Sequence, residues 1–301
     1  MTPRLEAYVL LNGPWKPDAG EFATVLEARY PGIGRVRGDA PEEGSGMPTV
    51  FTVDGAAVQV SMVGAPYPPE QLEPPMRLLE HVDTEEVARA HVAYMMISTE
   101  WTASDDPDDA GENAEMAAAY AALLTLVTAT VAEEAPALAA FWTESWRFVS
   151  IDEIKEAAAA VMRGEPPLSL WYALAEVKGA RAGGGDMRGM MSFGLRAFCG
   201  REIEVAPAPL SAMAAQGIAR DLAERIFAGD LPEDHAALPH DALEAPAVLR
   251  HAERFMRPQQ PVALIVPPGA SIDVETLEPK RSGGGNRGGL VSRFFSAGSR
   301  R

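Results

Sequence analysis

Two β-type segments joined by Asp-Gly constrain the fold more than any other feature of this sequence. The runs TVFTV (49–53) and AAVQVSMV (56–63) are separated only by Asp54 and Gly55. A two-residue turn of type I′ needs positive φ at both central positions, and Asp-Gly is one of the pairs that adopt it most readily. The sequence therefore predicts an antiparallel hairpin over residues 49–63.

The first hundred residues place other strands and short helices around this hairpin. The run LEAYVLL (5–11) predicts a buried strand, and residues 21–30 carry apolar side chains at helical spacing. A short helix is expected over 84–90, and a further strand over 91–98 (HVAYMMIS). This order is typical of the ferredoxin-like style of α+β fold, with helices on one face of an antiparallel-rich sheet.

The second half also alternates strands and helices, without a clean sequence repeat. A long helix should follow the acidic segment SDDPDDAGENAE, and Ser150 with Glu153 forms a capping box that predicts the start of the next helix. Later elements are expected as strands over 168–177, 187–195 and 261–267 and a helix over 209–228. The predicted fold class is α+β, with a mixed, largely antiparallel sheet or pair of sheets and helices packed on one face; two ferredoxin-like-style units are one form of it.

Residues 1–278 are predicted to form a single α+β domain, or two halves of about 1–104 and 105–278. Residues 279–301 have no core-forming pattern and are rich in Gly, Ser and Arg, which predicts a disordered basic tail. If this tail is helical, Phe294 and Phe295 fall on an apolar stripe near Arg287 and Arg293. Such a segment could dock on a partner or make a weak contact with an anionic membrane, or it could simply be a solubilising end.

The charge balance bears on partners. The formal net charge is -17, and the tail from Lys280 to Arg301 carries +6, so residues 1–279 carry -17 - 6 = -23. A body this acidic repels nucleic acid and anionic membranes, and it suits a basic protein partner. Cys199 is the only cysteine, so no internal disulfide can form, as expected in a reducing cytoplasm. No uninterrupted apolar run reaches roughly 18 residues and no signal peptide is recognisable, which predicts a cytoplasmic protein without an integral membrane segment.

Three blocks of the chain look familiar in their order. They are VQVSMVGAPYPPEQLE, EEVARAHVAYMMIS and LWYALAEVKGARAGGGDMRGMMSFGLRAFCGREIEV. Over roughly residues 5–230, this ordered set resembles the bacterial family called domain of unknown function 4261. The resemblance implies an α+β architecture and a bacterial cytoplasmic setting. It matches His91 to the histidine before the internal strand and Cys199 to a small residue of a turn, and it brings no catalytic residues with it.

The segment around Cys199 allows two interpretations. A catalytic thiol needs a lowered pKa and usually a histidine base, but the nearest histidine in the sequence is His235. Arg201 could stabilise a thiolate, whereas Glu202 would oppose it. Residues 193, 195, 197 and 199 are Phe, Leu, Ala and Cys, which predicts a strand whose small, buried thiol faces the core.

Metal and phosphate motifs are weak. Asp234, His235, His240 and Asp241 lie close together in the sequence, but in a Pro-rich segment with no helix to set ligand geometry, and no zinc pattern is present. We therefore predict no metal and no cofactor. The stretch KGARAGGGDMRGM lacks Gly-Lys-Ser/Thr and precedes a strand, which favours a hairpin loop over a phosphate loop. Its Arg188 leaves a weak anion-binding option.

Two functions follow as hypotheses. The first is a non-enzymatic cytoplasmic bacterial protein that binds a basic partner protein, as an accessory or immunity-like factor. The alternative is an enzyme or small-ligand-binding protein whose site contains His91, Arg188, Arg201 and Glu202, provided that the sheet brings these residues around one pocket. The sequence does not decide whether the protein has a catalytic activity.

Overall fold

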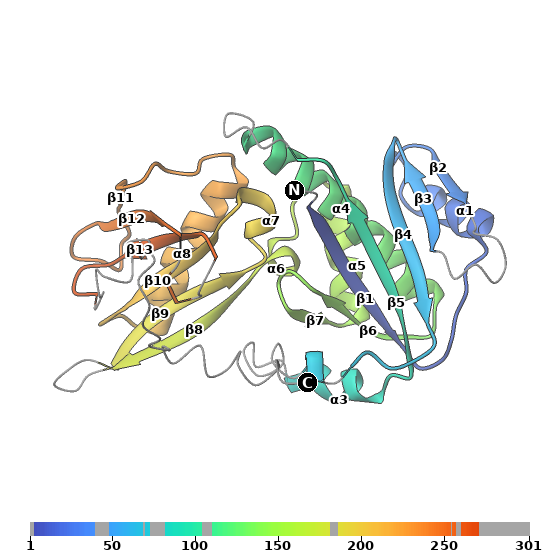
Figure 1. The fold of residues 1–301 in the computed structure, drawn as a ribbon, viewed down its shortest axis with the longest axis horizontal. Helices are drawn as coiled ribbons and strands as arrows, with labels where there is room; N and C mark the ends of the chain where they lie inside the picture. The colour runs from blue at the N-terminus through green and yellow to red at the C-terminus, as the bar shows by residue number, and fades with distance from the viewer. Residues whose placement is uncertain are drawn as a thin grey trace, which may run out of the picture. The chain divides into compact units, whose positions relative to one another are not determined.

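The structure, a computed structural model, describes residues 3–39, 48–68, 70–72, 82–103, 110–180, 186–253, 255–256 and 260–270. The chain divides into two units (Figure 1). Unit 1 comprises Met1–Ala173 and Phe193–Phe198, and unit 2 comprises Leu174–Ser192 and Cys199–Arg301. The division falls near residue 173 rather than near residue 104. The predicted tail, with Arg287, Arg293, Phe294 and Phe295, lies outside the described residues.

Each unit has its own sheet, and the α+β class predicted from the sequence is confirmed. The sheet of unit 1 has the order β2-β3-β4-β5-β1-β6-β7, with antiparallel pairing between neighbours. Its strands are β1 (Arg4–Leu11), β2 (Val36–Asp39), β3 (Thr49–Val53), β4 (Ala56–Val63), β5 (Ala93–Glu100), β6 (Ala137–Trp142) and β7 (Arg147–Val149). The first strand in the chain is therefore near the middle of the sheet, between β5 and β6.

The predicted Asp-Gly hairpin is present. Asp54 and Gly55 have φ angles of 48° and 92°, and Val53 pairs with Ala56 at the end of the β3–β4 ladder. Both central residues have positive φ, as a type I′ turn requires, and its twist matches that of the flanking strands. Local turn chemistry alone thus sets the register of two adjacent strands.

Helices cover the two faces of this sheet unequally. The helices are α1 (Ala19–Arg29), α3 (Val82–Ala90), α4 (Ala110–Glu134), α5 (Ile151–Met162), α6 (Leu168–Trp171) and α7 (Arg196–Cys199). Helix α4 contacts β1, β5 and β6 and packs against α5, and both helices lie behind the strands in Figure 1. The opposite face carries an apolar cluster made of Tyr8, Leu10, Leu72, Ala88, Phe141 and Phe148. Because Ala88 belongs to α3, this short helix covers the second face.

Helix α4 bears on the expectation that the chain has no integral membrane segment. Among the described residues it is the one helix that is long and apolar enough to cross a membrane by length and composition, with a mean hydropathy of 1.5 over its candidate span. Counting uninterrupted apolar runs missed it, because threonines such as Thr125 and Thr128 interrupt the run. In the structure, 56% of the span is buried, and both threonines lie in the interior of unit 1. A helix at the centre of a folded core is apolar because its surroundings are apolar, and the same holds for a helix that spans a membrane.

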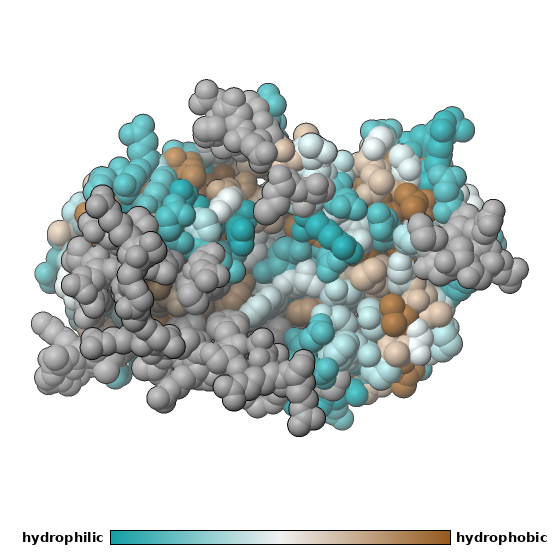
Figure 2. Space-filling model, viewed as in Figure 1, coloured by the Kyte–Doolittle hydropathy of each residue, from teal (hydrophilic) through white to brown (hydrophobic). Residues whose placement is uncertain are grey.

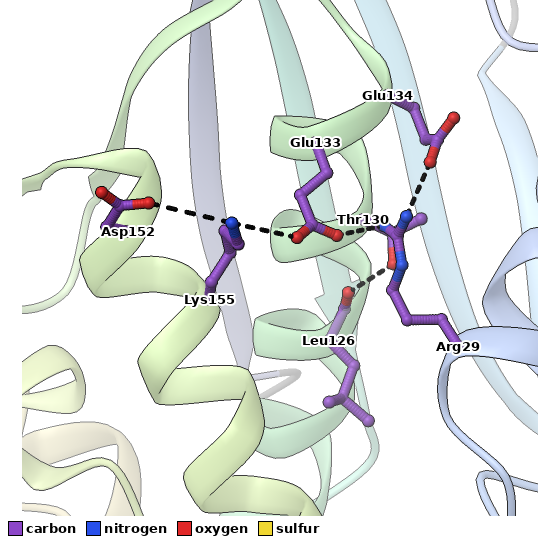
Figure 3. A network of polar contacts seen from close by, with 7 residues as sticks. All are labelled: Arg29, Leu126, Thr130, Glu133, Glu134, Asp152 and Lys155. Carbon is purple, nitrogen blue, oxygen red and sulfur yellow. Dashed lines mark hydrogen bonds and ion pairs between the residues drawn. The ribbon is translucent and has the colours of Figure 1, made fainter.

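An ion-pair network joins three helices of unit 1 (Figure 3). Helix α4 ends in Glu133 and Glu134 and has no basic residue in its last turn, an arrangement that the helix dipole disfavours. Arg29 of α1 compensates by pairing with both carboxylates, at 2.7 Å from Nη2 to Glu134 Oε1. Lys155 of α5 lies 3.6 Å from Glu133 and 3.8 Å from Asp152. The network fixes the end of α4 beside α1.

Unit 2 is built on a six-stranded sheet with the order β11-β12-β13-β10-β9-β8, in which β10 and β13 are parallel. Its strands are β8 (Ala173–Ala180), β9 (Asp186–Phe193), β10 (Glu202–Ala208), β11 (Ala237–Leu238), β12 (Ala247–Ala252) and β13 (Val262–Val266). Helix α8 (Ala212–Phe227) packs against β10 and buries Ile218, Leu222 and Ile226. It confirms the helix predicted over 209–228, and Ser211 caps it by accepting the Ala214 N–H at 3.1 Å.

Two predicted strand segments are partly helical. Residues 168–171 form the single turn α6, and β8 begins only at Ala173. The strand expected to continue through Cys199 ends at Phe193, and residues 196–199 form α7. Gly194 explains this break: its φ is +104°, and a Cβ on it would lie 2.3 Å from the Trp171 carbonyl oxygen. Because only glycine fits this position, the chain turns here and strand alternation stops.

Candidate functional site

His91 is one of the four residues predicted for a ligand site, and the structure gives it a structural role. The side chain is buried, with 6% of its surface exposed. Its Nε2 accepts the Tyr67 N–H at 2.8 Å, and its Nδ1–H donates to the Ala88 carbonyl. Burial lowers the pKa of His91, so the ring stays neutral near pH 7. With both nitrogens bonded, His91 joins the segment before α3 to the end of that helix.

Arg188, Arg201 and Glu202 belong to unit 2, and they do not form one cluster. Arg188 on β9 is paired with Glu176 and with Asp186, the latter at 3.1 Å. Arg188 lies opposite Ala208, at the far end of β10 from Glu202. Six strand positions separate the two, or about 20 Å. The β9–β10 pairing thus keeps Arg188 away from Glu202 and Arg201.

Glu202 is buried, and its carboxylate is used within the sheet. Its Oε2 accepts the Ser192 hydroxyl at 2.6 Å, and the Ser192 oxygen in turn accepts the Ile203 N–H at 2.7 Å. Glu204, two residues along the same strand, is fully buried and accepts the Met256 N–H at 2.7 Å. The alternation Glu202–Glu204 was present in the sequence, but only the fold shows that both carboxylates lie inside.

Cys199 is not poised as a nucleophile. Its Sγ donates to the Arg201 carbonyl at 3.2 Å, and burial raises the pKa of the thiol to about 12. A thiol with a pKa this high stays protonated near neutral pH, and the thiolate is the reactive form. The structural interpretation of Cys199 therefore stands, although the residue lies in α7 and not in a strand.

The β6–β7 turn holds a polar group that sequence reasoning missed. Glu144 Oε1 accepts the Glu6 N–H at 3.1 Å, where the pairing of β1 with β6 ends, and Glu144 Oε2 is shielded from solvent with no hydrogen-bond partner among the described residues. Burial raises the pKa of Glu144 to about 8. In the same turn Trp146 has a φ of 54°, which is unusual for a bulky residue. Acidic residues are too common in this sequence for Glu144 to stand out.

Glu6 itself belongs to a polar group on the β1 strand. Its carboxylate accepts the Tyr8 hydroxyl at 2.8 Å and pairs with Arg4 at 2.6 Å. Burial, together with the hydrogen bond to Glu6, raises the pKa of Tyr8. Tyr67 packs on Tyr8 with ring centroids 4.7 Å apart. Each carboxylate oxygen of Glu6 thus bonds a group of the same chain.

A groove of about 470 Å³ runs along α1 of unit 1. Its walls are formed by Trp15, Lys16, Pro17, Asp18, Gly20, Glu21, Phe22, Thr24, Val25 and Glu134. The half-exposed Trp15 ring meets Phe22 edge-on, with centroids 6.2 Å apart. Asp18 caps α1 by accepting the Gly20 and Glu21 N–H groups at 2.9 Å, so this helix end is already occupied by a carboxylate.

The groove is acidic and aromatic. Asp18, Glu21 and Glu134 supply three carboxylates, and Lys16 is the only cation among its described lining residues. Glu134 is held in place by Arg29, the α1 residue of the network in Figure 3. A half-buried tryptophan ring that lines a groove together with carboxylates is an arrangement that binds cations by cation–π attraction and ion pairing.

A second polar cluster lies at the β11–β12 end of unit 2. Asp234 Oδ1 accepts the His251 N–H at 2.8 Å and lies 3.7 Å from Arg250 Nε. His235, which has a φ of 66°, lies 3.4 Å from Asp234 Oδ2. Arg201 reaches this place with a 3.4 Å hydrogen bond from Nη1 to the Ala252 carbonyl. The fold thus brings Arg201, one of the predicted ligand residues, near His251 and Arg250, which the sequence analysis did not single out.

The weak metal motif is divided between two environments. Asp234 and His235 belong to the cluster just described, whereas His240 packs over Gly217 of α8 and lies 3.5 Å from Asp221. Within the part of the chain that the structure describes, no three His, Cys, Asp or Glu side chains are grouped so that they could hold a metal ion.

Comparisons with known proteins add no relatives: no family model, curated protein or solved structure matches this chain. Functional inference therefore depends on the residues themselves.

On the face seen in Figure 2, hydrophilic residues are spread over the coloured surface, and hydrophobic residues occur in small separated groups.

Proposed function

We propose that this protein is a non-enzymatic accessory factor of the bacterial cytoplasm that binds a basic segment of a partner protein in the α1 groove. The single observation that carries the proposal is the groove itself, where the half-exposed Trp15 lies beside three carboxylates. Tryptophan is one of the residues that dominate protein interfaces, and carboxylates around it are complementary to a cationic partner. The bacterial and cytoplasmic setting in this proposal rests on the family resemblance and on the single cysteine.

The distribution of ion pairs supports a basic partner. Many cationic side chains of the described fold already hold a carboxylate of the same chain; they are Arg4, Arg29, Arg147, Lys155, Arg163, Arg188, Arg225 and Arg250. With 43 acidic and 26 basic residues in the chain, this internal pairing leaves a surplus of carboxylates for external cations. Long-range attraction from such a surface speeds the encounter with a basic protein and repels nucleic acid.

In the proposed complex, a lysine or arginine of the partner lies over the Trp15 ring and pairs with Glu21. Glu134 contributes less, because Arg29 already neutralises part of its charge. Lys16 opposes the incoming cation. The groove therefore predicts opposite effects from two neighbouring substitutions: Glu21→Lys weakens binding of the partner, and Lys16→Gln strengthens it.

Affinity capture with the full-length protein tests this. We expect the wild type to retain a partner that added salt releases. The amount of this partner that is retained should fall by about tenfold or more with Trp15→Ala and with Glu21→Lys. Glu156→Lys is the matched control, because Glu156 is an exposed glutamate of α5 outside the groove. A partner lost equally with Glu156→Lys, or one whose retention is indifferent to salt, would contradict the proposal.

A further inference from the structure

His251 in unit 2 has a hydrogen-bonding position that its own chain does not fill. Its Nε2 has no hydrogen-bond partner among the described residues and is shielded from solvent. In the neutral tautomer that carries its proton on Nδ1, Nε2 is a bare acceptor. A buried acceptor without a donor costs free energy, so a ligand that donates a hydrogen bond there is favoured.

Arg201 supplies the complementary groups next to this acceptor. Its guanidinium reaches Ala252, the neighbour of His251, through one hydrogen bond of 3.4 Å, close to the long limit for such a bond. Its other N–H groups form a planar fork suited to an oxyanion. No described carboxylate is within ion-pairing distance of Arg201, in contrast to Arg188, which is held by Glu176 and Asp186.

Arg201 and Asp234 are the charged groups that act on the His251 ring. The Asp234 carboxylate is occupied by the His251 and His235 backbone N–H groups and by Arg250. Glu202, next to Arg201, is engaged with Ser192, and Glu253, next to Ala252, is exposed. The Arg201 charge adds to burial in lowering the pKa of His251, so the ring is neutral near pH 7. The site thus offers one acceptor from His251 and several donors from Arg201.

We propose that Arg201 and His251 form a binding site for hydrogen phosphate. This ion has the two features the site requires: an O–H that donates to His251 Nε2 and further oxygens that accept from the Arg201 fork. Sulfate has the acceptors but no O–H. A phosphomonoester has a second pKa of about 6 and is mostly the dianion without a proton at neutral pH, so the site favours the free ion over a phosphorylated side chain. This inference is independent of the α1 groove and of the partner proposed for it.

Calorimetric titration of the full-length protein with inorganic phosphate, sulfate and phosphoserine, at about pH 7.5 and constant ionic strength, tests the site. We expect saturable phosphate binding that is about tenfold or more tighter than sulfate binding, with phosphoserine weaker than phosphate. Equal affinity for sulfate and phosphate, or no saturable phosphate binding, would overturn the proposal. This comparison uses only the wild-type protein, so it is decisive even where a variant fails to fold.

Two substitutions locate the site, and a third serves as control. Arg201→Gln removes the charged fork, and His251→Asn removes Nε2 while leaving an amide donor near the position of Nδ1. Each should weaken phosphate binding by about tenfold or more, whereas Arg188→Gln, which removes an arginine of the same unit, should change it by less than about twofold. Equal losses in all three variants would show nonspecific attraction and would contradict the assignment.

Discussion

The two units use the hydrogen-bonding positions of a histidine ring in different ways. In unit 1, His91 bonds the Ala88 carbonyl through Nδ1 and the Tyr67 N–H through Nε2. In unit 2, His251 Nε2 is shielded from solvent and has no hydrogen-bond partner among the described residues. Burial lowers the pKa of both rings. The direction of the pKa shift is therefore the same for His91 and His251, and the two rings differ in their hydrogen-bond partners.

This difference teaches how to interpret polar residues in an acidic chain with abundant carboxylates. A group whose bonding positions are all filled by its own chain is used for structure, as His91 is. The two carboxylate oxygens of Glu6 are likewise each bonded within the chain, to Arg4 and to Tyr8. A group with an unfilled, shielded position is a candidate for binding. Glu144 of unit 1 is the informative exception, because its unfilled oxygen belongs to a carboxyl that keeps its proton in the folded state.

The largest effect is expected from Glu144→Gln, measured as the pH dependence of the free energy of unfolding. The pKa of Glu144 is about 8 in the folded chain, against 4.5 for an unperturbed glutamate. Between these values only the folded chain holds the proton, so the stability that this group contributes at low pH is lost as pH rises through 8. At about 1.4 kcal/mol per pH unit, the loss approaches roughly 4–5 kcal/mol.

Glutamine keeps the oxygen that accepts the Glu6 N–H and does not ionise. The variant should match the wild type near pH 4 and exceed its stability by a few kcal/mol above pH 8. Chemical denaturation across this range provides the measurement. Parallel pH profiles for the two proteins would show that the Glu144 carboxyl is solvated and ionised like an ordinary surface glutamate.

Next in size is His91→Leu, which replaces the ring by an apolar side chain and leaves the Tyr67 N–H and the Ala88 carbonyl without their partner. Urea denaturation should show a loss of about 2–4 kcal/mol. His251→Asn removes a ring nitrogen that has no described partner and should cost less than about 1 kcal/mol. The comparison between the histidines fails if the two variants lose equal stability.

Turn and cap chemistry made part of this fold predictable. Asp54-Gly55 specified a hairpin, and Ser150 with Glu153 specified a helix start that the structure confirms by both bonds of the capping box, at 3.2 and 2.7 Å. These signals are local, so the sequence contains all of their information. The ends of strands near Trp171 and Gly194 were mispredicted, because the close approach of these two residues is a tertiary contact.

The candidate sites were less predictable than the fold. His91, Arg188, Arg201 and Glu202 were selected for their chemistry, but three of them are satisfied by neighbours that only the folded chain brings close. Arg201 remains a candidate, and its partner His251 lies 50 residues later on β12, two strands away from β10. Spacing along the chain does not carry such information. The α1 groove was also missed, since its residues have no motif.

A smaller effect is expected from replacing the serine that caps one helix in each unit. Ser150 of α5 belongs to a reciprocal capping box, whereas Ser211 of α8 makes a single bond to the Ala214 N–H. We expect Ser150→Ala to cost about 1–1.5 kcal/mol and Ser211→Ala about 0.5–1 kcal/mol in the free energy of unfolding. Thermal and urea denaturation can resolve this difference, and a reversed order would mean that the glutamate of the box adds nothing.

The most direct test of the account is an NMR titration of the histidine ring signals of the full-length protein with inorganic phosphate near neutral pH. Loss of one signal in His251→Asn assigns His251, and loss of another in His91→Leu assigns His91. The account predicts that the His251 ring signal shifts with saturation while the His91 signal stays in place. A phosphate titration in which the two rings respond alike, or in which His251 does not respond, would contradict the claim that an unfilled hydrogen-bonding position marks the binding site.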